Sequence, residues 1–325
     1  MTSEAKARAM ALSALAHWGG AVEPPRLVCH RENIVFEARL RSGQHVALRL
    51  HRPGYQSRAA VEAELEWCEA LAARGFATPR PVRAVNGRLT AHLERRSVSC
   101  VTWLEGAPIG AGDIPLSQDP DTVAAQGRAL GRLLAQLHNL TDEGASPARF
   151  EREEWNAEAL LGERPLWGRF WENPTLTPEE RDLLLAAREK ARAVLQIAQD
   201  YGPIHADVLR ENVLAGPEGY ALIDFDDCGN GYRLYDLGTA LVQAVGDPML
   251  GRLAKALLVG YTSLRPVEEG QLALVPAFVA LRSFASAGWV MTRVAPDDPR
   301  MRAYAGRAVL MARHLLAGTV PWDWE

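Results

Sequence analysis

The hydrophobic and polar positions along the chain divide it into a strand-rich first part and a helical remainder. Before residue 105, short stretches rich in apolar and β-branched residues are bounded by Gly, Pro and Asn, a pattern that predicts strands. Asn86-Gly87 is the strongest hairpin turn in the chain. The expected strands are 27–28, 34–40, 45–50, 82–85, 89–94 and 97–104, and the expected helices of this part are 3–18 and 58–74.

After residue 121 the apolar residues recur at helical spacing. Between the two parts, segment 110–121 is rich in Gly, Asp and Pro, which marks a domain boundary. We therefore expect an α+β protein with a small mixed β-sheet domain, 1–104, and a larger, mainly helical domain, 105–325. The expected helices of the second domain are 123–140, 178–199, 236–245, 249–265, 268–294 and 300–317, with Asp121 or Thr122 as N-cap of the first and Asp236 as N-cap of the third.

One strand of the first domain carries two different faces. Val46, Leu48 and Leu50 share one face, and Ala47 and Arg49 share the other, because side chains alternate along a strand. A small residue beside a cation suits a surface that covers a nucleotide. Ala47 would leave room for a flat base, and Arg49 would reach the phosphates.

The helix expected over 58–74 carries an acidic residue, Glu64, on a partly apolar stripe. Two interpretations stay open at this point. Glu64 pairs with Arg49 and fixes that cation for phosphate contact, or it is a solvated charge equivalent to Glu62 or Glu66.

Composition and charge exclude several classes of function. The 325 residues are 48% hydrophobic and 23% charged, as in a soluble globular protein. A net charge of -4 argues against a nucleic-acid binder and gives no membrane-surface signal. No stretch approaches 18 uninterrupted apolar residues, so we expect no transmembrane helix. The four cysteines have no CxxC spacing, which disfavours zinc, and we expect a cytoplasmic protein.

The candidate chemistry lies between residues 204 and 237. Asp207 is followed five residues later by Asn212, and a turn and an apolar run then lead to Asp224. Phosphoryl transfer needs such a set, because one Asp orients or deprotonates the attacking hydroxyl while an Asn and a second Asp hold Mg²⁺. Each residue alone reads as a turn or strand-end residue. Their joint order is that of a protein-kinase-like site.

Neighbouring residues add detail to this site. His205 is expected to hold the loop by packing and hydrogen bonding. Arg210 either compensates charge on the transferred phosphoryl group or lies on the surface. Asp226 either supports the metal site or, together with Asp227, caps the next turn. The chain has no Walker-type G-x4-G-K-[ST], no G-x-S-x-G and no H-E-x-x-H.

These motifs resemble a known family. IHADVLRENVL and LIDFDDCGNGYRLYDLGTAL resemble the active-site signature of the aminoglycoside phosphotransferase and choline kinase superfamily, H-G-D-x4-N…D-[FW]-[DE]…D-L. ENIVFEAR and VALRLHRPGY resemble its first strands, EAELEWCEALAARGFATPRPV its first-lobe helix, and VTWLEG its hinge. The FDDCGNG variant is most similar to the homoserine-kinase-like and stress-response-kinase-like branches.

The resemblance implies a bilobal protein-kinase-like fold that binds ATP in its cleft. It implies that Asp207 is the catalytic base and that Asn212 and Asp224 are Mg²⁺ ligands. Arg49 and Glu64 would be the pair that positions the phosphates. Ser99 and Val101, together with Ala47, would lie near the adenine.

The chain departs from the family pattern in three places. Ala206 replaces the usual Gly, Arg49 stands where most kinases have Lys, and the phosphate-covering turn CHREN has no glycine. Arg keeps the charge and is a bidentate phosphate donor.

The leading hypothesis is an ATP- and Mg²⁺-dependent kinase acting on a hydroxyl of a small molecule, such as an amino alcohol, an amino acid or an aminoglycoside-like compound. The alternatives are a protein Ser/Thr kinase and a non-catalytic pseudokinase. An acidic acceptor cavity would indicate an amino alcohol or aminoglycoside-like acceptor, and a basic one a carboxylate-bearing acceptor. Arg282, Trp289 and Arg293 are candidates for that pocket, with buried packing as the alternative.

Overall fold

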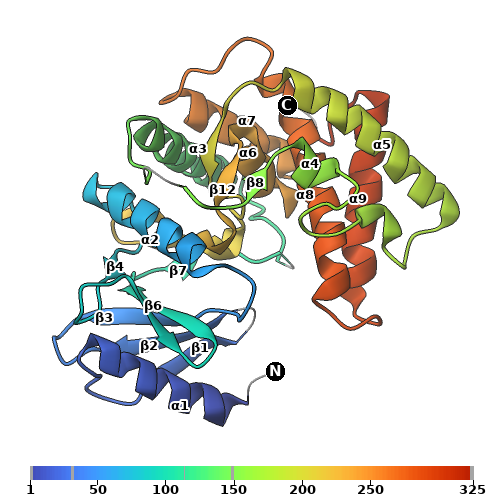
Figure 1. Ribbon diagram of the computed structural model, residues 1–325. Coiled ribbons are helices and arrows are strands. Elements are labelled where there is room, and N and C mark those ends of the chain that lie inside the picture. Colours follow the sequence, from blue (N-terminus) through green and yellow to red (C-terminus); the bar gives the residue numbers. More distant parts are fainter. Residues whose placement is uncertain (1–2, 31–32, 113, 148–149, 323–325) are drawn as a thin grey trace. The chain divides into compact units, whose positions relative to one another are not determined.

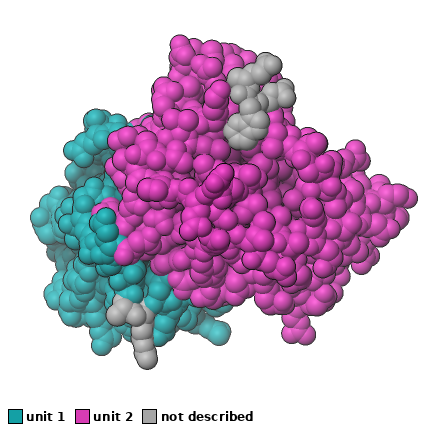
Figure 2. Space-filling view, turned by 90° about the horizontal axis from the view of Figure 1, so that it is seen from above, with its two compact units in different colours: residues 1–107, 143–152, 216–226 teal, residues 108–142, 153–215, 227–325 magenta. Residues whose placement is uncertain are grey.

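A computed structural model describes residues 3–30, 33–112, 114–147 and 150–322. The chain forms two compact units, coloured separately in Figure 2. The sequence suggested a single change of domain near residue 104, whereas the chain crosses between the units several times. The first unit comprises 1–107, 143–152 and 216–226, and the second comprises 108–142, 153–215 and 227–325.

An antiparallel sheet forms the centre of the first unit (Figure 1). Its order is β1-β2-β3-β6-β4, and β5 also pairs with β6. The predicted turn CHREN joins the first two strands, and its Arg31 and Glu32 lie outside the described residues. The strands are β1 (Arg26–His30), β2 (Ile34–Arg39), β3 (His45–Leu50), β4 (Pro81–Val82), β5 (Thr90–Leu93) and β6 (Arg96–Thr102).

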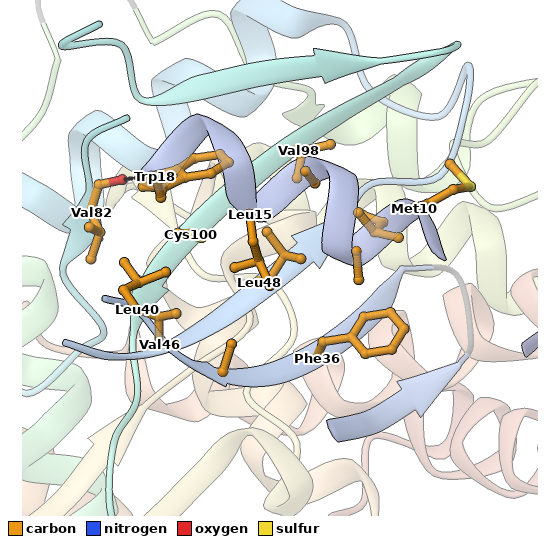
Figure 3. Packing of buried hydrophobic residues seen from close by; sticks show 14 of the residues in the cluster. Met10, Leu15, Trp18, Phe36, Leu40, Val46, Leu48, Val82, Val98 and Cys100 are labelled. Carbon is orange, nitrogen blue, oxygen red and sulfur yellow. Dashed lines mark hydrogen bonds between the residues drawn. The ribbon is translucent and has the colours of Figure 1, made fainter. Parts of the chain in front are cut away.

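One face of this sheet is covered by the first helix, α1 (Glu4–Leu15), and the short 3-10 turn η1 (Ala16–Trp18) that continues it. Figure 3 shows their side chains packed over those of β2 and β3, with the Trp18 Nε1–H donating to the Val82 carbonyl at 2.7 Å. The predicted inward face of β3, which includes Val46 and Leu48, is fully buried here. Gly19 ends the helix in the left-handed region at φ +82°.

The opposite face of the sheet packs against α2 (Arg58–Ala73), which begins at an N-cap Ser57. Val61 and Leu65 of this helix form a small core, against which Ala47 packs. The face of β3 that carries Ala47 and Arg49 therefore looks toward α2.

The predicted Asn86-Gly87 turn forms, with the Ala84 N–H donating to the Arg88 carbonyl at 2.8 Å. The strands that flank it, β4 and β5, both pair with β6. The local turn signal was therefore right, but the strand pairing depends on the longer β6.

Helices make up most of the second unit. A small sheet of order β8-β12-β9 lies among them, formed by β8 (Glu154–Trp155), β12 (Gly229–Tyr232) and β9 (Tyr201–Ile204). The remaining strands, β7 (Ala107–Pro108), β10 (Val213–Gly216) and β11 (Gly219–Leu222), lie near points where the chain changes unit. The helices are α3 (Pro120–Asp142), α4 (Ala157–Leu161), α5 (Pro178–Ile197), α6 (Arg233–Val242), α7 (Leu250–Thr262), α8 (Val275–Trp289) and α9 (Pro299–Ala317), with 3-10 turns η2 (Phe170–Glu172), η3 (Arg210–Asn212), η4 (Phe225–Asp227), η5 (Leu272–Leu274) and η6 (Val290–Thr292).

Two predicted helix caps are wrong. Asp119, rather than Asp121 or Thr122, caps α3, because its carboxylate accepts the backbone N–H of Thr122 at 3.1 Å. Asp236 does not cap α6, which begins three residues earlier at Arg233. Asp236 is fully buried inside that helix.

The stretch Leu272–Thr292 is long and apolar enough to cross a membrane by length and composition. Of its most apolar window, 72% is buried inside the protein, as in the core helix of a soluble protein.

Helices α3 and α7 approach closely through glycines. A Cβ added at Gly131 of α3 would collide with the carbonyl oxygen of Leu257 in α7 and lie 2.7 Å from the Tyr261 backbone nitrogen. A Cβ added at Gly260 of α7 would collide with the backbone of Arg128. The two backbones therefore occupy the space that a larger side chain would need.

We expect Gly131→Ala to destabilise the protein, although Ala favours helices more than Gly does. Forcing the helices apart should lower the free energy of unfolding by about 1–3 kcal/mol. Gly306→Ala in α9 is the matched control, since a Cβ there meets nothing within 4 Å. It should raise the free energy of unfolding by about 0.5–1 kcal/mol. Denaturant unfolding measures both, and equal effects of the two variants would contradict the close packing.

Candidate active site

The loop between β9 and β10 in the second unit carries two of the predicted catalytic residues. The Asn212 Nδ2 donates to the Asp207 Oδ2 at 2.9 Å and to the Asp207 backbone carbonyl at 2.9 Å. The D-x4-N spacing thus closes a short loop in which the amide orients the carboxylate. Because the amide nitrogen is engaged with Asp207, the Asn212 side-chain oxygen is the atom suited to a cation.

Asp236 anchors this loop from within α6. Its Oδ2 accepts the backbone N–H of His205 at 2.9 Å, and its Oδ1 accepts that of Ala206 at 2.7 Å. The sequence pattern predicted Asp236 as a helix cap and did not indicate this role. The available signal was the final Asp-Leu of the family signature, which falls on residues 236–237.

Asp236 is supported in turn by a buried chain of hydrogen bonds. His138 Nε2 lies 3.2 Å from Asp236 Oδ2, and His138 Nδ1 lies 2.8 Å from the Tyr261 hydroxyl. Burial lowers the pKa of His138, so the ring is neutral, and we assign Nε2–H as the donor to Asp236. Burial raises the pKa of Asp236, but the hydrogen bonds from His138 and from the His205 backbone help to outweigh it, so the net pKa is lowered and the carboxylate is ionised.

Two residues of the predicted site have left-handed backbone. Ala206 has φ +65° and Asp224 has φ +62°. Such a conformation costs an L-residue about 1–2 kcal/mol, which explains why the family signature has Gly where this chain has Ala206. The hydrogen bond from the Ala206 N–H to Asp236 helps to hold that strained residue.

His205 and Arg210 hold the loop in different ways. The buried His205 ring accepts the Asp207 N–H at its Nδ1, at 3.2 Å, which confirms the predicted role of this histidine. Arg210 is also buried, and its guanidinium donates to the carbonyls of Ala111 and Ile114. The surface interpretation of Arg210 is therefore wrong.

Arg282 of α8 makes the most consequential contact in this unit. Its Nη2 donates to the Asp207 Oδ1 at 2.6 Å, and its guanidinium lies over the Trp167 ring at 4.6 Å from the centroid. Burial lowers the pKa of Arg282, but the charge of Asp207 outweighs it and raises the pKa above the ordinary value. Of the three predicted pocket residues, Arg282 touches the candidate base, whereas Arg293 lies over the Trp289 ring.

The first unit brings together Arg49, Glu64 and Asp224. Arg49 Nη1 donates to Glu64 Oε1, and Glu64 is 1% exposed while Glu66 is exposed. The ion-pair interpretation of Glu64 is therefore correct. Arg49 Nη2 lies 3.3 Å from Asp226 Oδ1 and 3.5 Å from Asp224 Oδ1. Burial lowers the pKa of Arg49, but these three carboxylates outweigh it and the pKa is raised.

A second buried arginine of the first unit was not predicted. Arg152 donates to the Ala60 carbonyl at 3.1 Å and to the Asp226 carbonyl, and its Nη1 lies 3.9 Å from Glu64 Oε2. It thereby ties the residues around Asp224 to α2. No local pattern marks Arg152, because it lies in a segment far from both in sequence.

Among the described residues, the ion pairs of this group join more carboxylates than guanidinium groups. Glu64, Asp224 and Asp226 face two guanidinium groups, those of Arg49 and Arg152, so three negative charges meet two positive ones. The Asp224 side chain is 51% exposed, compared with 12% for Asp226 and 1% for Glu64. Asp224 is thus the carboxylate of this group that is accessible to a cation.

The predicted adenine-side residues lie on paired strands. Ala47 is opposite Val101, and Arg49 is opposite Ser99. The Ser99 hydroxyl is buried 2.8 Å from the His51 Nε2. Its side chain is therefore engaged with His51, while Ala47 and Val101 present small apolar surface.

His51 is a buried histidine beside the charged group of the first unit. Burial, followed by the repulsion of Arg49, lowers its pKa to about 3. The ring is therefore neutral near pH 7, and it adds no further positive charge beside Arg49.

No metal cluster of three or more His, Cys, Asp or Glu side chains occurs among the residues that the structure describes. The predicted Mg²⁺ ligands are instead one amide, Asn212 in the second unit, and one carboxylate, Asp224 in the first. Both supply oxygen, the donor that Mg²⁺ prefers.

The fold and these residues define the class of protein-kinase-like phosphotransferases. The sequence matches the Phosphotransferase enzyme family (APH) over residues 25–269, and the chain belongs to this family and is a kinase. This membership confirms the resemblance to the aminoglycoside phosphotransferase and choline kinase superfamily, and the protein-kinase-like α+β fold is confirmed with it.

Individual relatives agree with this membership. Homoserine kinase of Methylobacterium radiotolerans is 30% identical over 252 residues, which are 71% of this chain and 72% of that protein. A microcompartment-associated aminopropanol kinase is similar in structure, with a TM-score of 0.83 and 29% identity, over 95% of this chain and 98% of its own. An amicoumacin kinase solved with AMP-PNP and Ca²⁺ has a TM-score of 0.75 over 100% of this chain and 99% of its own, and at 19% identity it shows the fold alone.

We expect Asp236→Asn to loosen the catalytic loop. The amide nitrogen of Asn would face one of the two backbone N–H groups that Asp236 now accepts. One buried donor would lose its acceptor, which should lower the free energy of unfolding by about 1–3 kcal/mol. Denaturant unfolding tests this, with Asp121→Asn as the control, since the Asp121 side chain is 91% exposed. Equal stability of the two variants would contradict the anchoring role.

We expect His51 to make the protein less stable as the pH falls. Its pKa is about 3 in the folded protein and 6.5, the ordinary value, in the unfolded chain. Below pH 6.5 the unfolded chain therefore binds a proton that the folded protein does not bind. Between pH 7 and pH 5, wild type should therefore lose more stability than His51→Gln. Denaturation midpoints at both pH values measure this. His92→Gln, at an exposed site, should behave as wild type, and an unchanged pH dependence in His51→Gln would refute the assignment.

Proposed function

We propose that this kinase transfers the γ-phosphoryl group of ATP to a hydroxyl group of a small molecule, with Mg²⁺ as the metal. The observation that carries the proposal is the Asp207 carboxylate, whose two oxygens are held by Asn212 at 2.9 Å and by Arg282 at 2.6 Å. A carboxylate fixed in this way is suited to orient an attacking hydroxyl group and to accept its proton.

Arg49 is the proposed ligand of the nucleotide phosphates. Its position is set by Glu64 behind it, and its second guanidinium nitrogen faces Asp224 and Asp226. A guanidinium held by a buried carboxylate pays little entropy when it binds a phosphate oxygen. Ala47 and Val101, small and paired across the sheet, are the proposed neighbours of the adenine, together with Ser99.

Asn212 and Asp224 are the proposed ligands of Mg²⁺. Their donor chemistry fits this ion, because Mg²⁺ prefers oxygen ligands. The amide nitrogen of Asn212 contacts Asp207, so its side-chain oxygen is the atom suited to the ion, and the Asp224 carboxylate is half-exposed. The bound ion would neutralise charge on the phosphates. The amicoumacin kinase that was solved with AMP-PNP and Ca²⁺ shares this fold, which supports the use of a nucleotide and a divalent cation.

The reaction forms a bond from the acceptor oxygen to the γ-phosphorus and breaks the bond from that phosphorus to the β–γ bridging oxygen. ADP leaves with the electron pair of the broken bond. The hydroxyl proton passes to Asp207. Arg282 keeps the Asp207 carboxylate aimed while this happens.

The acceptor belongs to the amino alcohols, amino acids or aminoglycoside-like compounds. The relatives named homoserine kinase and aminopropanol kinase support a small hydroxyl compound. We further propose that the protein acts in the cytoplasm.

We expect Asp207→Ala to lower kcat/KM by about 10²–10⁴-fold, because it removes the group that orients the hydroxyl and takes its proton. The assay is ADP release from ATP and Mg²⁺ with a panel of hydroxyl compounds. Asp182→Asn, at an exposed position of α5, is the control and should keep wild-type rates.

Three outcomes would count against the proposal. Equal rates in Asp207→Ala and wild type would reject Asp207 as the base. A melting temperature raised by ATP and Mg²⁺ without transfer to any acceptor would indicate a pseudokinase. Transfer of labelled phosphate to the protein itself would indicate a protein Ser/Thr kinase.

A further inference from the structure

Arg307 of α9 differs from other buried and partly buried arginines of the second unit. It is partly buried, and among the described residues it makes no hydrogen bond and no ion pair. Its guanidinium lies 5.5 Å from the ring centroid of Tyr304, one turn earlier on the same helix. This aromatic contact leaves the guanidinium N–H donors available.

The comparable arginines are satisfied by acidic groups. Arg233 pairs with Asp142, Arg188 pairs with Glu163 at 2.7 Å, and Arg265 lies 2.9 Å from Asp200. Each of these three arginines therefore has an acidic partner. Arg307 lacks such a partner within the described chain.

The surroundings of Arg307 are basic and belong to the catalytic region. Helices α8 and α9 pack against each other (Figure 1), and α8 carries Arg282, which holds Asp207. Burial lowers the pKa of Arg307, and the charges of Arg282 and Arg210 lower it further. Arg210 lies in the catalytic loop itself, three residues after Asp207.

The charges of Arg282 and Arg210 are already engaged. Arg282 donates to Asp207, and Arg210 donates to two backbone carbonyls. Arg307 is a third cation, which is partly desolvated and is repelled by the other two. Such a charge costs free energy unless an anion pairs with it. A planar guanidinium is well shaped to bind a carboxylate with two hydrogen bonds.

We propose that Arg307 binds a carboxylate of the acceptor, so that this kinase phosphorylates hydroxy acids, including hydroxy amino acids, in preference to amino alcohols without a carboxylate. This inference rests on the proposed function and specifies its substrate class. Asp207 would take the hydroxyl end of the acceptor, and Arg307 its anionic end. Arg282 contributes to both ends of this site: it donates a hydrogen bond to Asp207, and its positive charge acts on Arg307.

Matched acceptors test the substrate class in the wild-type protein. L-Homoserine and 3-aminopropan-1-ol differ only by the carboxylate, and so do L-threonine and 1-aminopropan-2-ol. We expect kcat/KM to favour the carboxylate member of at least one pair by tenfold or more. Turnover only of the members without a carboxylate would overturn the inference and leave the proposed function intact.

Arg307→Met tests the residue, because it keeps the length of the side chain and removes its charge. We expect KM for the preferred hydroxy acid to rise about 10- to 100-fold, because the variant loses a charged hydrogen bond to the carboxylate, and such a bond contributes about that factor to affinity. KM for ATP should not change and the unfolding midpoint should not fall, since Arg307 has no hydrogen-bond or ion-pair partner in the described chain and is repelled by Arg282 and Arg210. Arg313→Met, on an exposed part of α9, is the control and should match wild type. A higher KM for ATP in Arg307→Met would assign this arginine to the nucleotide phosphates and overturn the inference.

Binding separates this inference from the proposed function. Calorimetric titration of wild type and Arg307→Met with L-homoserine and L-threonine requires no turnover. Binding of a hydroxy acid by wild type, weakened in Arg307→Met, supports the carboxylate site even if no phosphate is transferred, in which case the proposed function alone fails. Equal binding by the two proteins, or binding by neither, overturns the inference.

Discussion

The buried carboxylate of Asp236 is the interaction on which the catalytic loop depends. It accepts two successive backbone N–H groups, from His205 and Ala206, and so sets the direction in which the chain enters Asp207. Hydrogen bonds to an ionised acceptor are stronger than neutral ones, and burial protects them from competition by water. The strained backbone of Ala206 is maintained because its N–H donates to Asp236, which is itself held by a hydrogen bond with His138.

The two units have charged groups of opposite net sign. In the first unit, three carboxylates meet two guanidinium groups, and the excess negative charge is exposed at Asp224. In the second unit, Arg282 donates to Asp207, and the positive charges of Arg282 and Arg210 both act on Arg307. The first pattern suits a cation and the second suits an anion, which agrees with the proposed metal and with the proposed carboxylate-bearing acceptor.

Local sequence patterns predicted much of the fold and the centre of the site. Helix α1, strand β3 and the loop from Asp207 to Asn212 follow from alternation, stop signals and spacing, which act between near neighbours. The Arg49–Glu64 pair was predicted as one of two alternatives. Arg152 and the contact of Arg282 with Asp207 could not be predicted to the same degree, since each joins segments separated by tens of residues.

The sequence by itself determined the class of protein, a kinase, because the residues proposed to transfer the phosphoryl group occur at short, recognisable spacings on one loop and after the following strand. Only the tertiary structure decided that Asp236 anchors this loop rather than capping a helix, and that Arg210 is buried. It also decided which charges remain without a partner, as Arg307 does within the described chain. The physical reason is that burial and pairing depend on which distant segments meet, and neither property is encoded in the spacing of neighbouring residues.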